Sequence, residues 1–80
     1  MKTEIFLNAI RERKRLKFSY GFSEITFEPY YLATNKFGKK VVFGRVNRTN
    51  EVKMLEFEKI YAISVLELPK FSPLIPLLPV

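Results

Sequence analysis

The sequence contains no cysteine, histidine, aspartate or tryptophan, and its eight acidic residues are all glutamate. Without cysteine there is no disulfide, no thiolate zinc site and no thiol nucleophile. Without histidine, the most common general base and the most common neutral metal ligand are also missing. These absences argue against an enzyme with a catalytic triad or dyad. We therefore expect a protein that is not an enzyme and that uses neither a metal nor another cofactor.

Long apolar stretches are missing as well. No stretch reaches the roughly 18 apolar residues that a membrane-spanning helix needs. The first ten residues carry Glu4 and Asn8 within their apolar run, which is not the pattern of a signal peptide. We therefore expect no membrane partner and a cytoplasmic location.

The residues that are present form a small, apolar and basic chain. It has 80 residues, of which 48% are hydrophobic and 15% aromatic, enough for one domain with a compact core. Fourteen Lys and Arg against eight Glu give a net charge of +6. This excess favours anionic partners through Coulomb steering and counterion release. Nucleic acid is therefore a candidate partner on charge alone.

Two different periodicities divide the chain. Apolar residues at helical spacing predict a helix over residues 4–14, and Thr3 is placed to cap it. The apolar stripe of this helix consists of Ile5, Phe6, Ala9 and Ile10. From residue 15 the period changes to two, which predicts strands. The expected strands cover residues 15–20, 24–33 with a bend or bulge at Pro29, 39–46, 52–57 and 60–68.

The last two expected strands have distinctive details. The alternation slips at Met54 and Leu55, which indicates a bulge, and residues 58–59 form a brief break between the strands. The fifth strand would place Tyr61, Ile63 and Val65 on one side.

The order of these elements predicts the fold class. One helix followed by five short strands is typical of an α+β, mainly β domain. We expect a small, strongly bent, five-stranded antiparallel barrel with the N-terminal helix over one open end. We assign residues 1–68 to this domain and residues 69–80 to a C-terminal tail.

The tail is rich in proline and leucine. From Pro73 to Val80 a proline recurs at every third residue, and nothing after Lys70 is charged. This period matches the three-residue turn of polyproline II. Such an apolar ribbon either docks on its own domain, pairs with a second copy in a homo-oligomer, or inserts into another protein.

Several landmarks, taken in order, resemble the WYL domain family. They cover most of the chain between residues 5 and 67. The landmarks are Ala9-Ile10, Leu16-Lys17-Phe18-Ser19-Tyr20, Phe27-Glu28-Pro29, Val41-Val42-Phe43-Gly44 and Leu55-Glu56-Phe57-Glu58-Lys59-Ile60. The resemblance implies a small Sm-like barrel with a leading helix, in agreement with the fold expected from periodicity.

The same resemblance implies a function. WYL domains are regulatory, ligand-sensing modules of bacterial transcription regulators and phage-defence proteins, and their ligands are thought to be nucleic acids or nucleotides. The aromatic pair of the family corresponds here to Lys40 and Val41, and the arginine before the Glu-Pro dipeptide to Ile25. The two late arginines of the family correspond to Glu56 and Lys59.

Candidate binding residues follow from this resemblance and from two basic runs. The runs comprise Arg11, Arg13, Lys14, Arg15 and Lys17, and then Lys36, Lys39, Lys40, Arg45, Arg48 and Lys53. We expect ligand contacts from Tyr20, Lys59, Arg45, Lys40, Arg15 and Arg48. Tyr20 would stack on a base and the cations would pair with phosphate. The alternatives are a half-buried structural tyrosine and solvated basic faces.

Two further patterns leave other functions open. Glu56 and Glu58 lie two apart on an expected strand, so they form either a carboxylate pair or a solvated strand face. The apolar tail favours an alternative function, a protein-interaction or assembly module with a vestigial pocket.

Overall fold

One helix and a five-stranded antiparallel sheet make up the described part of the computed structural model, which covers residues 1–47, 49 and 51–72. The sheet order is β4-β3-β2-β1-β5. This arrangement confirms the predicted α+β, mainly β fold with an N-terminal helix. The elements are α1 (Lys2–Glu12), β1 (Leu16–Tyr20), β2 (Ser23–Thr34), β3 (Lys40–Val46), β4 (Val52–Glu56), the 3-10 helix η1 (Phe57–Lys59) and β5 (Ile60–Val65).

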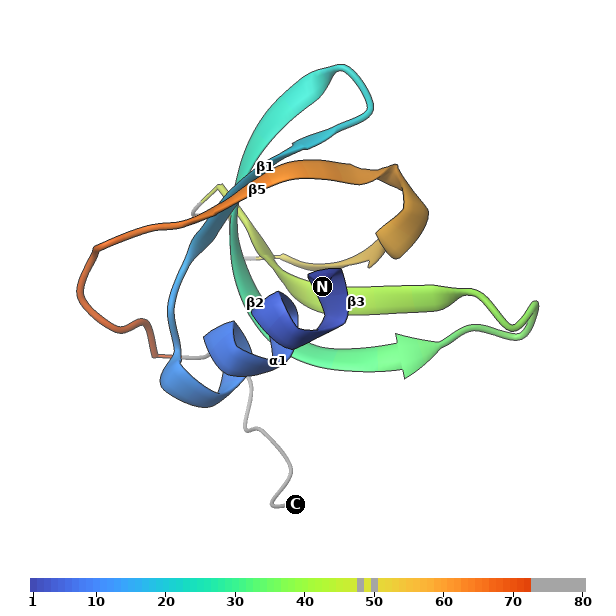
Figure 1. Ribbon diagram of the computed structural model, residues 1–80, viewed down its shortest axis with the longest axis horizontal. Helices are drawn as coiled ribbons and strands as arrows, with labels where there is room; N and C mark the ends of the chain where they lie inside the picture. The colour runs from blue at the N-terminus through green and yellow to red at the C-terminus, as the bar shows by residue number, and fades with distance from the viewer. Residues whose placement is uncertain (48, 50, 73–80) are drawn as a thin grey trace.

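Helix α1 lies in front of the curved sheet and buries one stripe against it (Figure 1). Phe6 and Ala9 are buried, as the helical spacing predicts. The predicted Thr3 cap is wrong, because the helix begins at Lys2 and the Thr3 hydroxyl instead accepts a hydrogen bond from Lys40. No helix in the described ranges is long and apolar enough to cross a membrane.

The long strand β2 organises the sheet, because it pairs with both β1 and β3. Its register against β3 shifts between Pro29 and Tyr31, which confirms the predicted irregularity at Pro29. A proline has no amide hydrogen to donate, so the ladder is interrupted there at little cost. Past this bulge the strand continues to Thr34.

The two edge strands, β4 and β5, are joined by only three residues of η1. Such a short connection between opposite edges requires the sheet to bend strongly, as Figure 1 shows. The Tyr20 hydroxyl at the end of β1 accepts a hydrogen bond from the Glu56 amide at the end of β4, at 3.0 Å. In the ranges that the structure describes, no strand ladder joins β4 to β5, so the sheet is curled but not closed.

The core fills the inside of this curled sheet, and every strand contributes to it. Four phenylalanine rings, from α1, β1, β2 and η1, form a continuous row with centroids 5.0 to 5.9 Å apart. The buried core residues are Phe6, Ala9, Leu16, Phe18, Ile25, Phe27, Val42, Leu55, Phe57 and Ile60. Aromatic pairs at this spacing stabilise a small core beyond the area that they bury.

The structure corrects two details of the late strands. The register of β4 against β3 is regular through Met54 and Leu55, so the predicted bulge there is wrong. Strand β5 ends at Val65 rather than at residue 68, and Tyr61 is exposed whereas Ile63 packs against the core, so these two residues do not share one side. The cause is a bulge opposite β1, where Ala62 has a φ of 54° and changes the face of the following residues.

Residues 66–72 continue along the domain after β5. The Leu66 amide donates to the Arg15 carbonyl and the Phe71 amide donates to the Arg13 carbonyl. The Phe71 ring is buried against Tyr30, with ring centroids 5.8 Å apart. The expected tail from Pro73 to Val80 lies outside the described residues, so its three alternatives stay predictions.

Gly44 provides a first test of the packing beside the Pro29 bulge. A Cβ at this position would overlap the Glu28 carbonyl and lie 2.6 Å from Phe27 Cζ. Because the overlap is with backbone, we expect Gly44→Ala to lower the free energy of unfolding by about 3 kcal/mol, measured by urea denaturation. Gly38→Ala is the control, because a Cβ at Gly38 would meet no atom within 4 Å. Its left-handed φ of 77° should lower the free energy of unfolding by only about 1 kcal/mol. Equal losses in the two variants would contradict this account.

Candidate functional site

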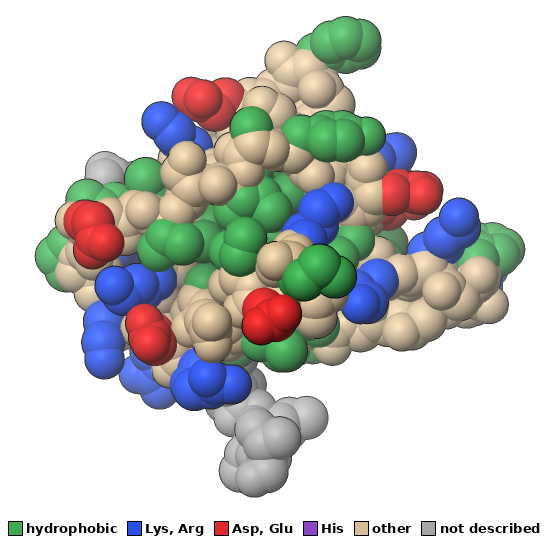
Figure 2. Space-filling view, viewed as in Figure 1, with side chains coloured by type: hydrophobic (Ala, Val, Ile, Leu, Met, Phe, Trp, Pro, Cys, Tyr) green, Lys and Arg blue, Asp and Glu red, His purple; other side chains and the backbone are tan. Residues whose placement is uncertain are grey.

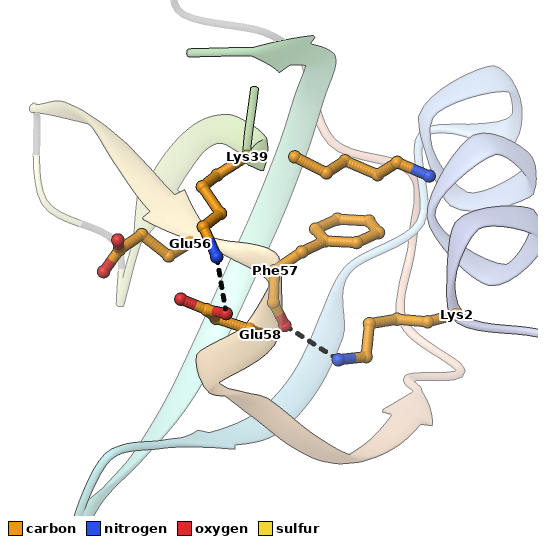
Figure 3. Close-up of a pocket in the computed structure, with 6 residues that line it drawn as sticks. Lys2, Lys39, Glu56, Phe57 and Glu58 are labelled. Atoms are coloured by element: carbon orange, nitrogen blue, oxygen red, sulfur yellow. Dashed lines mark hydrogen bonds and ion pairs between the residues drawn. The ribbon is translucent and has the colours of Figure 1, made fainter. Parts of the chain in front are cut away.

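An opening of about 290 Å³ lies where α1, β3 and η1 meet. We name it the lysine pocket, and Figure 3 shows it. Its lining residues are Lys2, Lys39, Lys40, Glu56, Phe57 and Glu58. Lys2 comes from the first turn of α1, Lys40 begins β3, and Phe57 begins η1. The pocket therefore exists only because the bent sheet brings η1 next to the start of the helix.

Lys2 and Lys40 are both held against the Phe57 ring. Each ammonium nitrogen lies 5.7 Å from the ring centroid, so the two nitrogens are at most 11.4 Å apart. Lys2 Nζ donates to the Phe57 carbonyl at 2.7 Å, and Lys40 Nζ donates to Thr3 Oγ1 at 2.9 Å. Phe57 itself is only 7% exposed, so its ring supports the two lysine stems and offers little surface of its own.

The lysines that line this pocket outnumber its glutamates, so a positive charge remains. Lys2 and Lys40 hydrogen-bond to neutral oxygens, and neither forms an ion pair within the described ranges. Lys39 pairs with Glu58 at 3.7 Å, but both side chains are more than half exposed, so this pair is weak. The N-terminal end of α1, beside Lys2, adds partial positive charge. The lysine pocket is therefore electropositive.

Tyr20 and Lys59 lie at the edge of the lysine pocket and both contact Glu56. The Tyr20 hydroxyl accepts the Glu56 amide, and Lys59 Nζ lies 2.7 Å from the Glu56 carboxylate. The hydrogen bond and the charge of that carboxylate raise the pKa of the Lys59 ammonium above its usual value. The Tyr20 hydroxyl therefore links β1 to β4, and its expected role in stacking on a base stays a prediction.

Arg15 and Arg45 lie in a different part of the molecule. Both pair with Glu28, Arg15 at 3.2 Å and Arg45 at 2.5 Å. We call these three residues the arginine cluster. The predicted site residues therefore separate into two groups: Lys40, Tyr20 and Lys59 at or beside the lysine pocket, and the two arginines on Glu28. Arg48 lies outside the described residues.

The other basic side chains do not form a single patch. Figure 2 shows Lys and Arg gathered over the C-terminal end of α1, with acidic side chains among them. Arg11 hydrogen-bonds to Asn8, Lys14 pairs with Glu67, and Lys53 pairs with Glu51. These three cations therefore each have a partner of their own.

Glu56 and Glu58 do not share a strand face, so that prediction is wrong. Glu56 ends β4, and the chain enters η1 before Glu58. Each glutamate pairs with its own lysine, Glu56 with Lys59 and Glu58 with Lys39. Throughout residues 1–47, 49 and 51–72, no group of three potential metal-ligating side chains gathers.

Sequence reasoning missed Lys2 and the role of Glu28. Lys2 reaches Phe57 across 55 positions of sequence, and no local pattern signals such a contact. Glu28 carries a weak signal, since it interrupts an otherwise apolar segment beside Pro29. It is the one charged residue that is buried in the described ranges.

The contact between Tyr20 and Glu56 can be tested by removing one hydroxyl. Tyr20→Phe leaves the Glu56 amide without its acceptor, so the free energy of unfolding should fall by about 1 kcal/mol in urea denaturation. Tyr61→Phe is the matched control, because Tyr61 is 62% exposed and should be neutral. A neutral Tyr20→Phe would show that this hydrogen bond does not hold β1 to β4.

Comparison with known proteins gives no relative from which a function can be transferred. Neither protein-family models, nor curated proteins, nor solved structures match this chain. The likeness to WYL domains therefore stays a prediction from the sequence. The function must be argued from the geometry and charge of the site itself.

Proposed function

We propose that this domain is a non-catalytic binding module whose lysine pocket takes a phosphate-bearing ligand, a nucleotide or a single-stranded nucleic acid. One observation carries the proposal: Lys2 and Lys40 are fixed beside the same ring without a carboxylate partner. Two ammonium groups without carboxylate partners give the pocket a positive potential, which attracts an anion to its opening. Because both nitrogens are already hydrogen-bonded in place, little ordering accompanies binding.

A nearby aromatic ring favours a nucleotide over a bare anion. Tyr61 is 62% exposed, and Lys2 Nζ lies 5.8 Å from the centroid of its ring. A base can stack on an exposed ring next to a cation that pairs with the neighbouring phosphate. Such stacking is tolerant of sequence, which suits a module that recognises nucleotides by shape and charge.

We also propose that the domain is a WYL-like member of the Sm-like barrels and that it acts as a cytoplasmic regulator. The order of the landmarks supports this, together with an N-terminal helix followed by five antiparallel strands. The short η1 link and the contact between Tyr20 and Glu56 support a sheet curled toward a barrel. Lys40 replaces an aromatic residue of the family signature at the pocket, so this chain would rely more on charge.

The proposal is tested by fluorescence anisotropy with a labelled single-stranded oligonucleotide at several salt concentrations. The double variant Lys2→Ala/Lys40→Ala should bind at least about tenfold more weakly, and its salt slope should fall by about 1.4, the value for two lost phosphate contacts on a single strand. The matched control is Lys36→Ala/Lys53→Ala, which removes the same charge away from the pocket. Equal weakening in both variants would refute a defined site.

A second pair of variants in the same assay separates stacking from charge. Tyr61→Ala should weaken binding by about tenfold, and Tyr61→Phe should restore it, because the phenylalanine ring stacks without the hydroxyl. If Tyr61→Ala binds as tightly as the natural chain, no base stacks on Tyr61, and the pocket recognises the phosphate alone.

A second candidate function is assembly with a protein partner, and one surface favours it. Tyr31 and Phe43 stack with centroids 4.7 Å apart, and Met54 pairs with Phe43 across β3 and β4. Tyr31 and Met54 are both more than 40% exposed. Exposed apolar rows of this kind occur at protein interfaces.

Assembly predicts an oligomer that depends on this row. Light scattering should then report more than one copy for the natural chain and a monomer for Tyr31→Ser/Met54→Ser. A monomeric natural chain would remove the homo-oligomer form of this function.

A further inference from the structure

The arginine cluster forms a single row across β3, β2 and the residue that precedes β1. Glu28 in β2 is paired in register with Arg45 in β3, and Arg15 directly precedes Leu16, which pairs with Phe27. The three side chains therefore meet on one face of the sheet. Arg15 Nε and Arg45 Nη2 both donate to Glu28 Oε2.

Glu28 has little accepting capacity left for further cations. Its side chain is 4% exposed, and Tyr30 donates its hydroxyl to Oε1 at 3.3 Å, in addition to the two arginines on Oε2. The Glu28 carboxylate holds the pKa of the Arg45 guanidinium above its usual value, against the opposite effect of burial. One carboxylate thus faces two permanent positive charges, and the cluster carries a net positive charge.

An opening of about 470 Å³ lies next to this cluster. Its lining residues are Arg15, Arg45, Leu68, Pro69 and Lys70. The Lys70 ammonium adds a third cation and forms no ion pair with another described residue. The segment is fixed there, because Arg15 Nη1 donates to the Pro69 carbonyl at 2.7 Å.

One buried donor beside this opening lacks an acceptor. Arg45 Nε is fully buried, and within the described ranges no atom accepts its hydrogen. A buried polar group without a partner costs free energy, so its persistence calls for an explanation. Because Nε has almost no exposed surface, a ligand oxygen in the opening would satisfy it only after the guanidinium group turned toward the opening.

We propose that Arg15, Arg45 and Lys70 form a second binding site, separate from the lysine pocket, for a phosphate group. Guanidinium groups match phosphate oxygens in geometry and keep their charge at all physiological pH values. Glu28 acts as the positioning residue, since it fixes both arginines on a rigid sheet before the ligand arrives. Leu68 and Pro69 supply an apolar wall for the group that carries the phosphate.

The test uses the uniformly ¹⁵N-labelled full chain and inorganic phosphate as the probe. The Nε–Hε signals of the arginines are followed by NMR during titration with potassium phosphate, against potassium chloride at matched ionic strength. We expect a saturable shift of the Arg45 and Arg15 signals with phosphate alone. Lys70→Ala should weaken this binding about fivefold, as for a partly exposed ion pair. Lys2→Ala/Lys40→Ala should leave it unchanged.

Arg45→Lys provides a second variant that keeps a cation on Glu28. It removes Nε and the planar fork, so phosphate binding read from the Arg15 signal should weaken at least about tenfold while the fold remains. Signals that respond equally to phosphate and chloride would overturn the proposal. Binding that is unaffected by Lys70→Ala and Arg45→Lys would also overturn it, and the cluster would then serve only to anchor residues 66–72.

Discussion

The strong bend of the sheet is the constraint on which the other features depend. Because β4 and β5 lie on opposite edges and are joined by three residues, the sheet has to curl until its edges approach. The curl creates an inside, which four phenylalanine rings and the apolar stripe of α1 fill. It also places η1 against the first turn of the helix, where Lys2 reaches the Phe57 carbonyl. The core and the lysine pocket are thus two consequences of one geometry.

On the outer face of the sheet, ion pairs add links between elements to those that the small hydrophobic core provides. A domain of this size buries a modest share of its surface, so the loss of an ion pair or hydrogen bond between its elements is a noticeable part of its total stability. Glu28 connects β2 to β3 through Arg45 and to the residue before β1 through Arg15, and Arg15 continues the connection to Pro69. Removing one partner of such a buried pair destabilises a protein, although replacing the whole pair by well-packed apolar residues is often neutral. The same two arginines line the neighbouring opening, so the cluster both holds residues 66–72 and presents positive charge there.

Periodicity predicted the features that local sequence determines. The helical spacing of Phe6 and Ala9 identified the buried stripe, and the missing amide hydrogen of Pro29 located the bulge. The side of β5 that faces the core was not predictable in this way, because Ala62 adopts a left-handed conformation that no local residue type signals. The contacts of Lys2 and Lys40 could not be predicted from the sequence either, because both depend on how far the sheet curls.

The two cationic sites differ in how their charges are held, and this difference bears on what each can recognise. In the lysine pocket, two long side chains are held by neutral oxygens and one ring, so no carboxylate competes with an incoming anion for their charges. In the arginine cluster, a buried carboxylate fixes two planar groups, so the geometry precedes the ligand. A site of the first kind accommodates phosphates in varied positions along a strand. A site of the second kind favours one phosphate in one orientation, because planar guanidinium groups match phosphate oxygens in geometry.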